Sequence, residues 1–115
     1  MNYEMTTAIY ELMNTIKADY YQTTSRNGRQ ALSELNKQMI DEFNASLSYQ
    51  EGRKYIKIIK GGSVWGFVMK EADKKFKAGD ILMAASWASP ARNHARGNVL
   101  EGGYTIQWTG PVYMK

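Results

Sequence analysis

The chain has 115 residues and a formal net charge of +4, with 43% hydrophobic and 23% charged residues. This length indicates a single domain, which can bury roughly two-thirds of the surface of the unfolded chain. The absence of cysteine excludes disulfides and thiolate metal sites. No apolar run approaches the roughly 18 residues of a membrane span, so we expect no membrane partner. The acidic N-terminal stretch lacks the basic start of a signal peptide, so we expect no secretion by that route.

The charge is divided unevenly along the chain. Residues 1–51 hold four basic and seven acidic side chains, a net −3, whereas residues 52–115 hold eleven basic and four acidic ones, a net +7. A basic half attracts polyanions such as nucleic acid, nucleotides or acidic protein surfaces. The alternative is a solvated lysine surface that keeps a small protein soluble.

Two amphipathic helices are predicted in residues 1–51. The first runs to about residue 21 and can be capped by Asn2 or Thr6. Its apolar residues recur every three or four positions; they are Met5, Ile9, Leu12, Met13, Ile16 and Tyr20. The second is expected from about Arg29 to Leu47, with Gly52 at the exit of the helical region. Its expected buried stripe is Leu32, Leu35, Met39, Phe43 and Leu47, with Ala31 and Ile40 beside it.

The periodicity changes after Arg53. Residues 54–60 are rich in β-branched and aromatic side chains and predict a strand, and Gly61-Gly62 predicts a tight hairpin turn. A second strand is expected from Ser63 to Lys70. Its alternation places Trp65, Phe67 and Met69 on one face. Gly66 inside this strand suggests a bulge or a close approach of the backbone.

Two further strands are predicted. A turn at residues 78–80 feeds a strand from Ile81 to residue 84 or 85, with Asp80 bonding nearby backbone. Residues 104–109 alternate strictly, so Tyr104, Ile106 and Trp108 should be buried. Gly110-Pro111 should end this strand, and residues 112–114 add a short edge piece.

The expected fold is therefore α+β, a single domain over residues 1–115. It consists of a helical part, residues 1–51, and a basic β-rich part, residues 52–115. We expect two N-terminal helices packed on a mostly antiparallel sheet of four to five strands, which either stays open or curls into a small barrel.

The residue content excludes several chemistries. One His and no Cys cannot supply a structural zinc site, so we expect no metal. His94 is the only imidazole, and neither Ser86 nor Ser89 lies in a nucleophile-elbow pattern. No phosphate-binding glycine loop is present. We expect no catalytic residue and no cofactor, and an enzyme is the less favoured reading.

The loop of residues 86–98 concentrates the remaining polar chemistry. Pro90 can start a short helix, which would place Arg92 and Arg96 on one face suited to phosphate, and Gly97 would end it. Trp87 either stacks on a base or closes the core, and core is the simpler expectation. The two arginines are alternatively surface charges, salt-bridge partners, or donors to backbone carbonyls. The candidate binding residues are Trp87, Arg92, Asn93, His94, Arg96, Asn98, Lys57 and Lys60.

The β-rich part resembles a known group of sequences. The runs GRKYIKII, GSVWGFV, KFKAGDILMAASWASPARNHARGNV and YTIQWTGPVYMK are similar to an uncharacterised family of small proteins of tailed bacteriophages, of marine and cyanobacterial phage type. The similarity covers residues 52–114. It implies a phage source and a shared C-terminal module, and it carries no activity or catalytic residue.

Three functions remain open. The first is a phage-type accessory protein that binds a host or phage protein, as an inhibitor, a virion component or a homo-oligomer. The second is a nucleic-acid or polyphosphate-binding module that uses the basic half, with Tyr55, Trp65 and Trp108 as candidate stacking residues. The third is a small-ligand binder or enzyme with its site at the loop, where Asp80 would join the arginines and His94. The expected location is the host cytoplasm or the virion.

Overall fold

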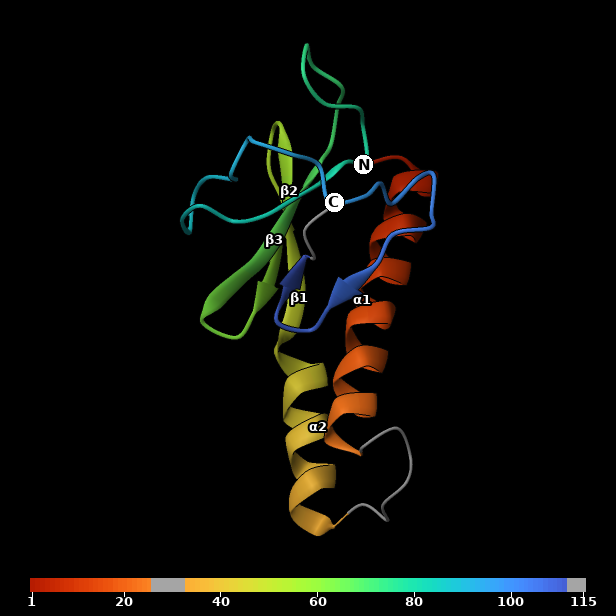
Figure 1. The fold of residues 1–115 in the computed structure, drawn as a ribbon, viewed down its shortest axis with the longest axis vertical. Coiled ribbons are helices and arrows are strands. Elements are labelled where there is room, and N and C mark those ends of the chain that lie inside the picture. The colour runs from red at the N-terminus through yellow and green to blue at the C-terminus, as the bar shows by residue number, and fades with distance from the viewer. Residues whose placement is uncertain (26–32, 112–115) are drawn as a thin grey trace.

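The fold is an α+β arrangement of two helices and an open, antiparallel sheet, in which the first helix runs alongside the sheet and the second lies at the end of the sheet and leads into its first strand (Figure 1). A computed structural model of the chain describes residues 1–25 and 33–111. Helix α1 spans Tyr3–Thr24 and helix α2 spans Glu34–Ser46. The helices run side by side and extend beyond the end of the sheet, so the molecule measures 48 × 28 × 27 Å.

Helix α1 supplies most of the helical contribution to the core. Asn2 caps its start, where its side-chain oxygen accepts a 2.7 Å hydrogen bond from the backbone N–H of Met5. The predicted apolar stripe is confirmed: Met5, Ile9, Leu12, Met13 and Ile16 are buried. These side chains pack against the helix-facing side of the sheet.

Helix α2 differs from its prediction at both ends. Ser33 caps it, so the helix begins at Glu34; the expected start at Arg29, together with Ala31 and Leu32, lies outside the described residues. The expected stripe is wrong for Leu35 and Met39, which are 66% and 40% exposed. Only the half of α2 next to the sheet buries apolar side chains, because its other half extends past the sheet edge. The buried side chains of α2 are Ile40 and Phe43.

The main sheet has the strand order β1-β2-β3-β4. Strand β1 spans Leu47–Glu51, β2 spans Tyr55–Lys60, β3 spans Ser63–Met69 and β4 spans Ile81–Leu82, all paired antiparallel. The sequence prediction assigned residues 47–51 to the helical part and is wrong there. Leu47 leaves the helix in extended conformation, and Gly52 lies in the turn to β2. The β-rich part therefore begins at residue 47.

The β2–β3 hairpin carries the predicted irregularity. Ile58 pairs with Gly66 but Ile59 pairs with Val64, so Trp65 is an extra residue in β3. The bulge turns Trp65 toward the helices, whereas Phe67 and Met69 face the other side of the sheet. The expectation that these three side chains share a face is therefore wrong. Gly66 allows a close approach of the backbone, because a Cβ there would lie 3.0 Å from the backbone oxygen of Leu82 and β4 would have to shift slightly.

The C-terminal strands are shorter than expected and form a separate pair. Strand β5 spans Ile106–Gln107 and strand β6 spans Gly110–Pro111. The Trp65 indole N–H donates to the Gln107 carbonyl at 2.8 Å, which ties this pair to the main sheet. The predicted alternation over residues 104–109 is confirmed, with Ile106 buried and Tyr104 and Trp108 only partly buried, although only two of these residues are in a strand. Gly110-Pro111 pairs with β5 instead of ending the sheet, and residues 112–114 lie outside the described part.

Candidate functional site

The sheet face away from the helices, called the open face below, is partly covered by the loop of residues 83–96. A second apolar cluster fills the space between sheet and loop; it consists of Phe67, Met69, Phe76 and Leu82, with Tyr55, Val64, Ala84 and Ala95 at its margin. This cluster is complete without Trp87. The loop is therefore held on the sheet by other side chains.

The loop is not helical, and this overturns the predicted helix at Pro90. Ala84 and Pro90 form a β-bridge, and the backbone N–H of Ala91 donates to the Met83 carbonyl at 2.7 Å. Residues 84–90 thus form a closed turn, after which the chain runs on without helical structure. Gly97 has φ +137° within this irregular segment and ends no helix.

Arg92 lies at one end of the open face in an ion pair. Its guanidinium donates to the Asp73 carboxylate at 2.6 Å and to the Tyr55 hydroxyl at 2.7 Å. These contacts raise the pKa of Arg92, chiefly through the hydrogen bond to Asp73. Lys75 also donates to the backbone oxygen of Arg92. The salt-bridge alternative is the one observed for this arginine.

Asp73 organises this end of the sheet. Its carboxylate accepts hydrogen bonds from the backbone N–H groups of Phe76 and Lys75, both at 2.9 Å, and it pairs with Lys54 at 3.2 Å. These backbone hydrogen bonds, followed by the one from Arg92, hold the pKa of the carboxyl well below its usual value of 3.8. The ionised form of Asp73 therefore ties residues 73–76 to β2 and to the loop.

Arg96 is buried and cannot act beside Arg92 in gripping a phosphate. Its side chain is 2% exposed, and its Nε donates to the His94 carbonyl at 3.3 Å. A second nitrogen lies 3.5 Å from the Asn93 side-chain oxygen. Arg96 thus donates to a backbone carbonyl and holds an irregular segment against the sheet. This is the predicted alternative in which a loop arginine is a donor to backbone carbonyls. The predicted shared face of the two arginines is wrong.

Asn98 is also a structural residue. It is 6% exposed and donates to the Ala78 carbonyl and to Asp80, both at 2.9 Å. Its side-chain oxygen accepts from the backbone N–H groups of Leu100 and Glu101. Asp80 in turn accepts from the Lys77 backbone, which confirms its predicted turn-forming role. Asn93 and His94 are exposed at the far end of the loop.

Trp87 lies at the tip of the loop and is 53% exposed, so the expectation that it belongs to the core is wrong. The Lys57 ammonium lies 4.3 Å from the centre of its ring. Lys57 extends from the middle of β2 on the open face, opposite Phe67 in β3. The structure therefore brings together two of the predicted binding residues, Lys57 and Trp87.

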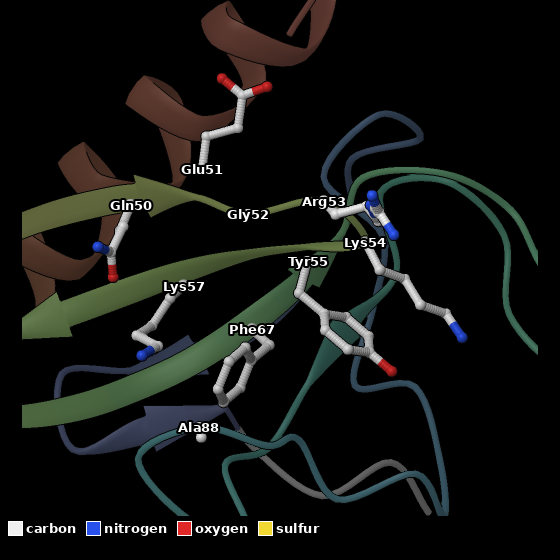
Figure 2. Close-up of a pocket in the computed structure, with 9 residues that line it drawn as sticks. All are labelled: Gln50, Glu51, Gly52, Arg53, Lys54, Tyr55, Lys57, Phe67 and Ala88. Atoms are coloured by element: carbon white, nitrogen blue, oxygen red, sulfur yellow. The ribbon is translucent and has the colours of Figure 1, made fainter.

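A hollow of about 270 Å³ lies next to this pair, at the turn between β1 and β2 (Figure 2). The Tyr55 ring forms its aromatic wall, and Ala88 from the loop lies opposite. Phe67 packs edge-to-face on Tyr55 with ring centres 5.9 Å apart and is itself only 2% exposed. Its remaining lining residues are Gln50, Glu51, Gly52, Arg53, Lys54 and Lys57. The Glu51 side chain points away toward α1 and pairs with Lys70 at 2.5 Å, so it contributes little charge to the hollow.

A second hollow of about 300 Å³ lies on the open face at the β2–β3 turn. Trp87 forms part of its wall together with small side chains from the two segments that flank it. The lining residues are Gly62, Ser63, Val64, Ala84, Ala85, Ser86 and Trp87. The first hollow is bordered by Tyr55 of β2, and the second by Val64, which pairs with Ile59 of β2. Lys57, which contacts Trp87, lies between Tyr55 and Ile59 along the strand.

Lys60 does not belong to this surface. Its ammonium lies 5.0 Å from the centre of the Trp108 ring, and Trp108 packs edge-to-face on Tyr20 at 5.0 Å, on the helix side of the sheet. Partial burial lowers the pKa of Lys60. Of the stacking candidates, Trp65 is 2% exposed and Trp108 lies on that same side. Only Tyr55 is in the site.

Sequence reasoning missed Gln50, Arg53 and Ala88. Gln50 was assigned to the end of a helical region and Arg53 to the start of the β-rich part, whereas the two residues flank the β1–β2 turn. The pattern S-Y-Q-E-G-R, polar residues around a Gly between two alternating segments, is the signal that could have indicated this hairpin. No sequence signal marked Ala88.

Two observations concern other site types. Among residues 1–25 and 33–111, no three His, Cys, Asp or Glu side chains gather in a group able to hold a metal ion. Neither helix, within the same ranges, has the length and apolar character needed to cross a membrane.

The comparison with known proteins gives one match. No curated protein and no solved structure matches the chain. Residues 1–113 match a family described as "Family of unknown function (DUF7717)", which covers both the helical and the β-rich parts. The chain belongs to this family of unknown function.

Proposed function

We propose that this protein is a non-enzymatic nucleic-acid-binding protein and that the open face of its sheet is the binding surface. The observation that carries the proposal is the half-exposed Trp87 ring, held by Lys57 between two hollows on a cationic face. An exposed aromatic ring beside positive charge is the arrangement that binds bases by stacking and phosphates by charge.

The charge of this face supports a polyanionic ligand. The basic side chains of the face are Arg53, Lys54, Lys57, Lys75 and Arg92. Asp73 is the carboxylate that contacts them, and it is occupied by Lys54 and Arg92. Within the described ranges, neither Arg53 nor Lys57 forms an ion pair with a carboxylate. These two cations are therefore available to phosphate, and release of counterions from the phosphates would favour binding.

The test is a titration of a fluorescently labelled oligonucleotide at about 50 mM salt, where phosphate contacts are strongest. Trp87→Ala should weaken binding about 5- to 150-fold, which corresponds to the roughly 1–3 kcal/mol of one base-stacking contact. Tyr21→Ala is the matched control, because Tyr21 is a similarly exposed aromatic (45%) on α1, away from the open face. Absence of binding by the unaltered protein at this salt would rule out the proposal.

A second candidate function is self-association through α2, which would make the protein a homo-oligomeric or protein-binding accessory factor. Leu35 and Met39 lie one turn apart on α2 and leave a large apolar area exposed. Light scattering at rising protein concentration tests this candidate. An oligomer that Leu35→Lys converts to a monomer would support it, and a monomer at all concentrations would exclude it.

The biological setting is a proposal that the resemblance to small phage proteins alone supports. In that setting the protein acts as an accessory factor in the host cytoplasm or in the virion, and its nucleic-acid ligand comes from the phage or the host. Detection of the protein in purified particles, by mass spectrometry, distinguishes the two locations.

A further inference from the structure

The two hollows on the open face differ in their linings but share one design. Each combines an apolar wall with a few polar groups at the edge. In the first hollow the aromatic wall is the Tyr55 ring, since Phe67 is 2% exposed. The polar groups at its edge include the Gln50 amide and the Lys57 ammonium, and Arg53 and Lys54 also line it. In the second, Trp87 is accompanied by the Val64 and Ala84 side chains and by the hydroxyls of Ser63 and Ser86.

The hollows are aligned along β2. Tyr55 borders the first hollow, and Val64, which borders the second, pairs with Ile59 of β2. The four residue steps from Tyr55 to Ile59 correspond to about 13 Å at the usual rise of a β-strand. Lys57 lies halfway between them and carries the Trp87 ring. An extended ligand that follows β2 would thus meet the Tyr55 ring first and then the Lys57–Trp87 pair, whose indole ring also lines the second hollow.

This chemistry fits flat rings with polar edges. A nucleobase has apolar faces, which stack on aromatic or aliphatic surfaces, and donors and acceptors around its rim. The Gln50 amide both donates and accepts, the Lys57 ammonium donates, and the two serine hydroxyls do either. The hollows, about 270 and 300 Å³, are of a size for single rings and admit no stacked double helix.

We propose that each hollow receives one unpaired base of an extended single strand that runs along β2, so the ligand is single-stranded nucleic acid and not duplex. This inference rests on the proposed function, because it specifies the ligand of the same surface. A duplex keeps its bases stacked and paired, and extracting one costs a few kcal/mol. A duplex would therefore reach only the cations of the face.

The first experiment compares three probes at about 50 mM salt: a single-stranded oligonucleotide, the duplex of the same sequence, and inorganic polyphosphate, which has charge but no bases. We expect the single strand to bind at least tenfold more tightly than the duplex, with quenching of the tryptophan fluorescence. Equal affinity for single strand and duplex would overturn the inference while leaving nucleic-acid binding intact. Failure of both nucleic acids to bind would overturn the proposed function as well.

The second experiment fills the hollows one at a time. Ala88→Phe places a ring in the first hollow, and Ala85→Phe places one in the second hollow. Both alanines are exposed, so neither substitution disturbs the core. Each should weaken single-strand binding at least tenfold and leave polyphosphate binding unchanged. Ala45→Phe, at an exposed position on α2, is the matched control and should alter neither. Unchanged single-strand binding in both hollow-filling variants, with the fold verified by circular dichroism, would overturn the inference.

Discussion

The Lys57 ammonium and the Trp87 ring are in contact, with 4.3 Å between the nitrogen and the ring centre, although one comes from the middle of a strand and the other from a loop tip. A cation–π contact at an exposed site contributes about 0.5–1 kcal/mol. The contact orients Trp87 without burying it, because the space beneath the loop is already filled by Phe67, Met69 and Leu82. The Trp87 ring is therefore not needed for packing and remains accessible to a ligand.

Removal of one cation from the open face should change the salt dependence of binding. Arg53→Gln is expected to reduce the slope of log K against log salt by about 0.7 for a single-stranded oligonucleotide, since one phosphate contact is lost. Titrations between about 50 and 200 mM salt measure this slope. Lys37→Gln removes the same charge from α2, where Lys37 is 56% exposed, and should leave the slope unaltered. Equal effects of both variants would indicate that net charge alone matters.

Much of the fold could be predicted, because the signals were local. The stripe of α1 has a 3.6-residue period, and Gly61-Gly62 joins two segments rich in β-branched residues. Strand β1 was missed, since Leu47 continues the apolar spacing of α2 and the S-Y-Q-E-G pattern after it was interpreted as the end of a helix. Its strand conformation comes from pairing with β2, a tertiary interaction that local propensity does not report.

The candidate site could be located in part only. Trp87 and Lys57 were named from the sequence, but their contact depends on how the loop crosses the sheet. The sequence spacing of Arg92 and Arg96 suggested a shared helical face. The chain is irregular there, so one arginine reaches Asp73 and the other is buried against carbonyls. Which polar groups a loop arginine meets is decided by tertiary packing, and spacing carries no information about it.

The Asp73 carboxylate makes stability depend on pH. Its folded-state pKa lies below the usual value of 3.8, so it stabilises the fold above that pH, and this contribution is lost as the pH falls through the folded-state pKa. Asp73→Asn should lower the melting temperature at pH 7, and its difference from the unaltered protein should narrow as the pH falls below 3.8. Thermal melts from pH 7 to about pH 2 measure this. Asp41→Asn, at an exposed carboxylate on α2, is the control; parallel curves for Asp73→Asn and the unaltered protein would contradict the assignment.

Asn98 should prove structural rather than functional. Asn98→Ala removes hydrogen bonds to the backbone of Ala78, Leu100 and Glu101 and leaves Asp80 short of a donor. We expect a loss of about 2–3 kcal/mol in the free energy of unfolding, measured with urea. Asn93→Ala, at an exposed position, should cost clearly less. A large loss of oligonucleotide affinity in Asn98→Ala without loss of stability would show that this residue contacts the ligand.

Gly97 is the glycine at which the backbone of the loop is most constrained. Its φ of +137° is one that side chains with a Cβ rarely adopt, and a Cβ there would lie 2.6 Å from the Cβ of Tyr104. Gly97→Ala should therefore destabilise the protein by at least about 2 kcal/mol, since backbone strain and a clash against a fixed atom add together. Gly62→Ala is the matched control, because a Cβ there meets no atom within 4 Å, and its effect should stay within about 0.5 kcal/mol. Urea unfolding of the two variants measures the difference. Equal free energies of unfolding for the two variants would contradict this prediction. They would mean that residue 97 can move away from Tyr104 without loss of stability.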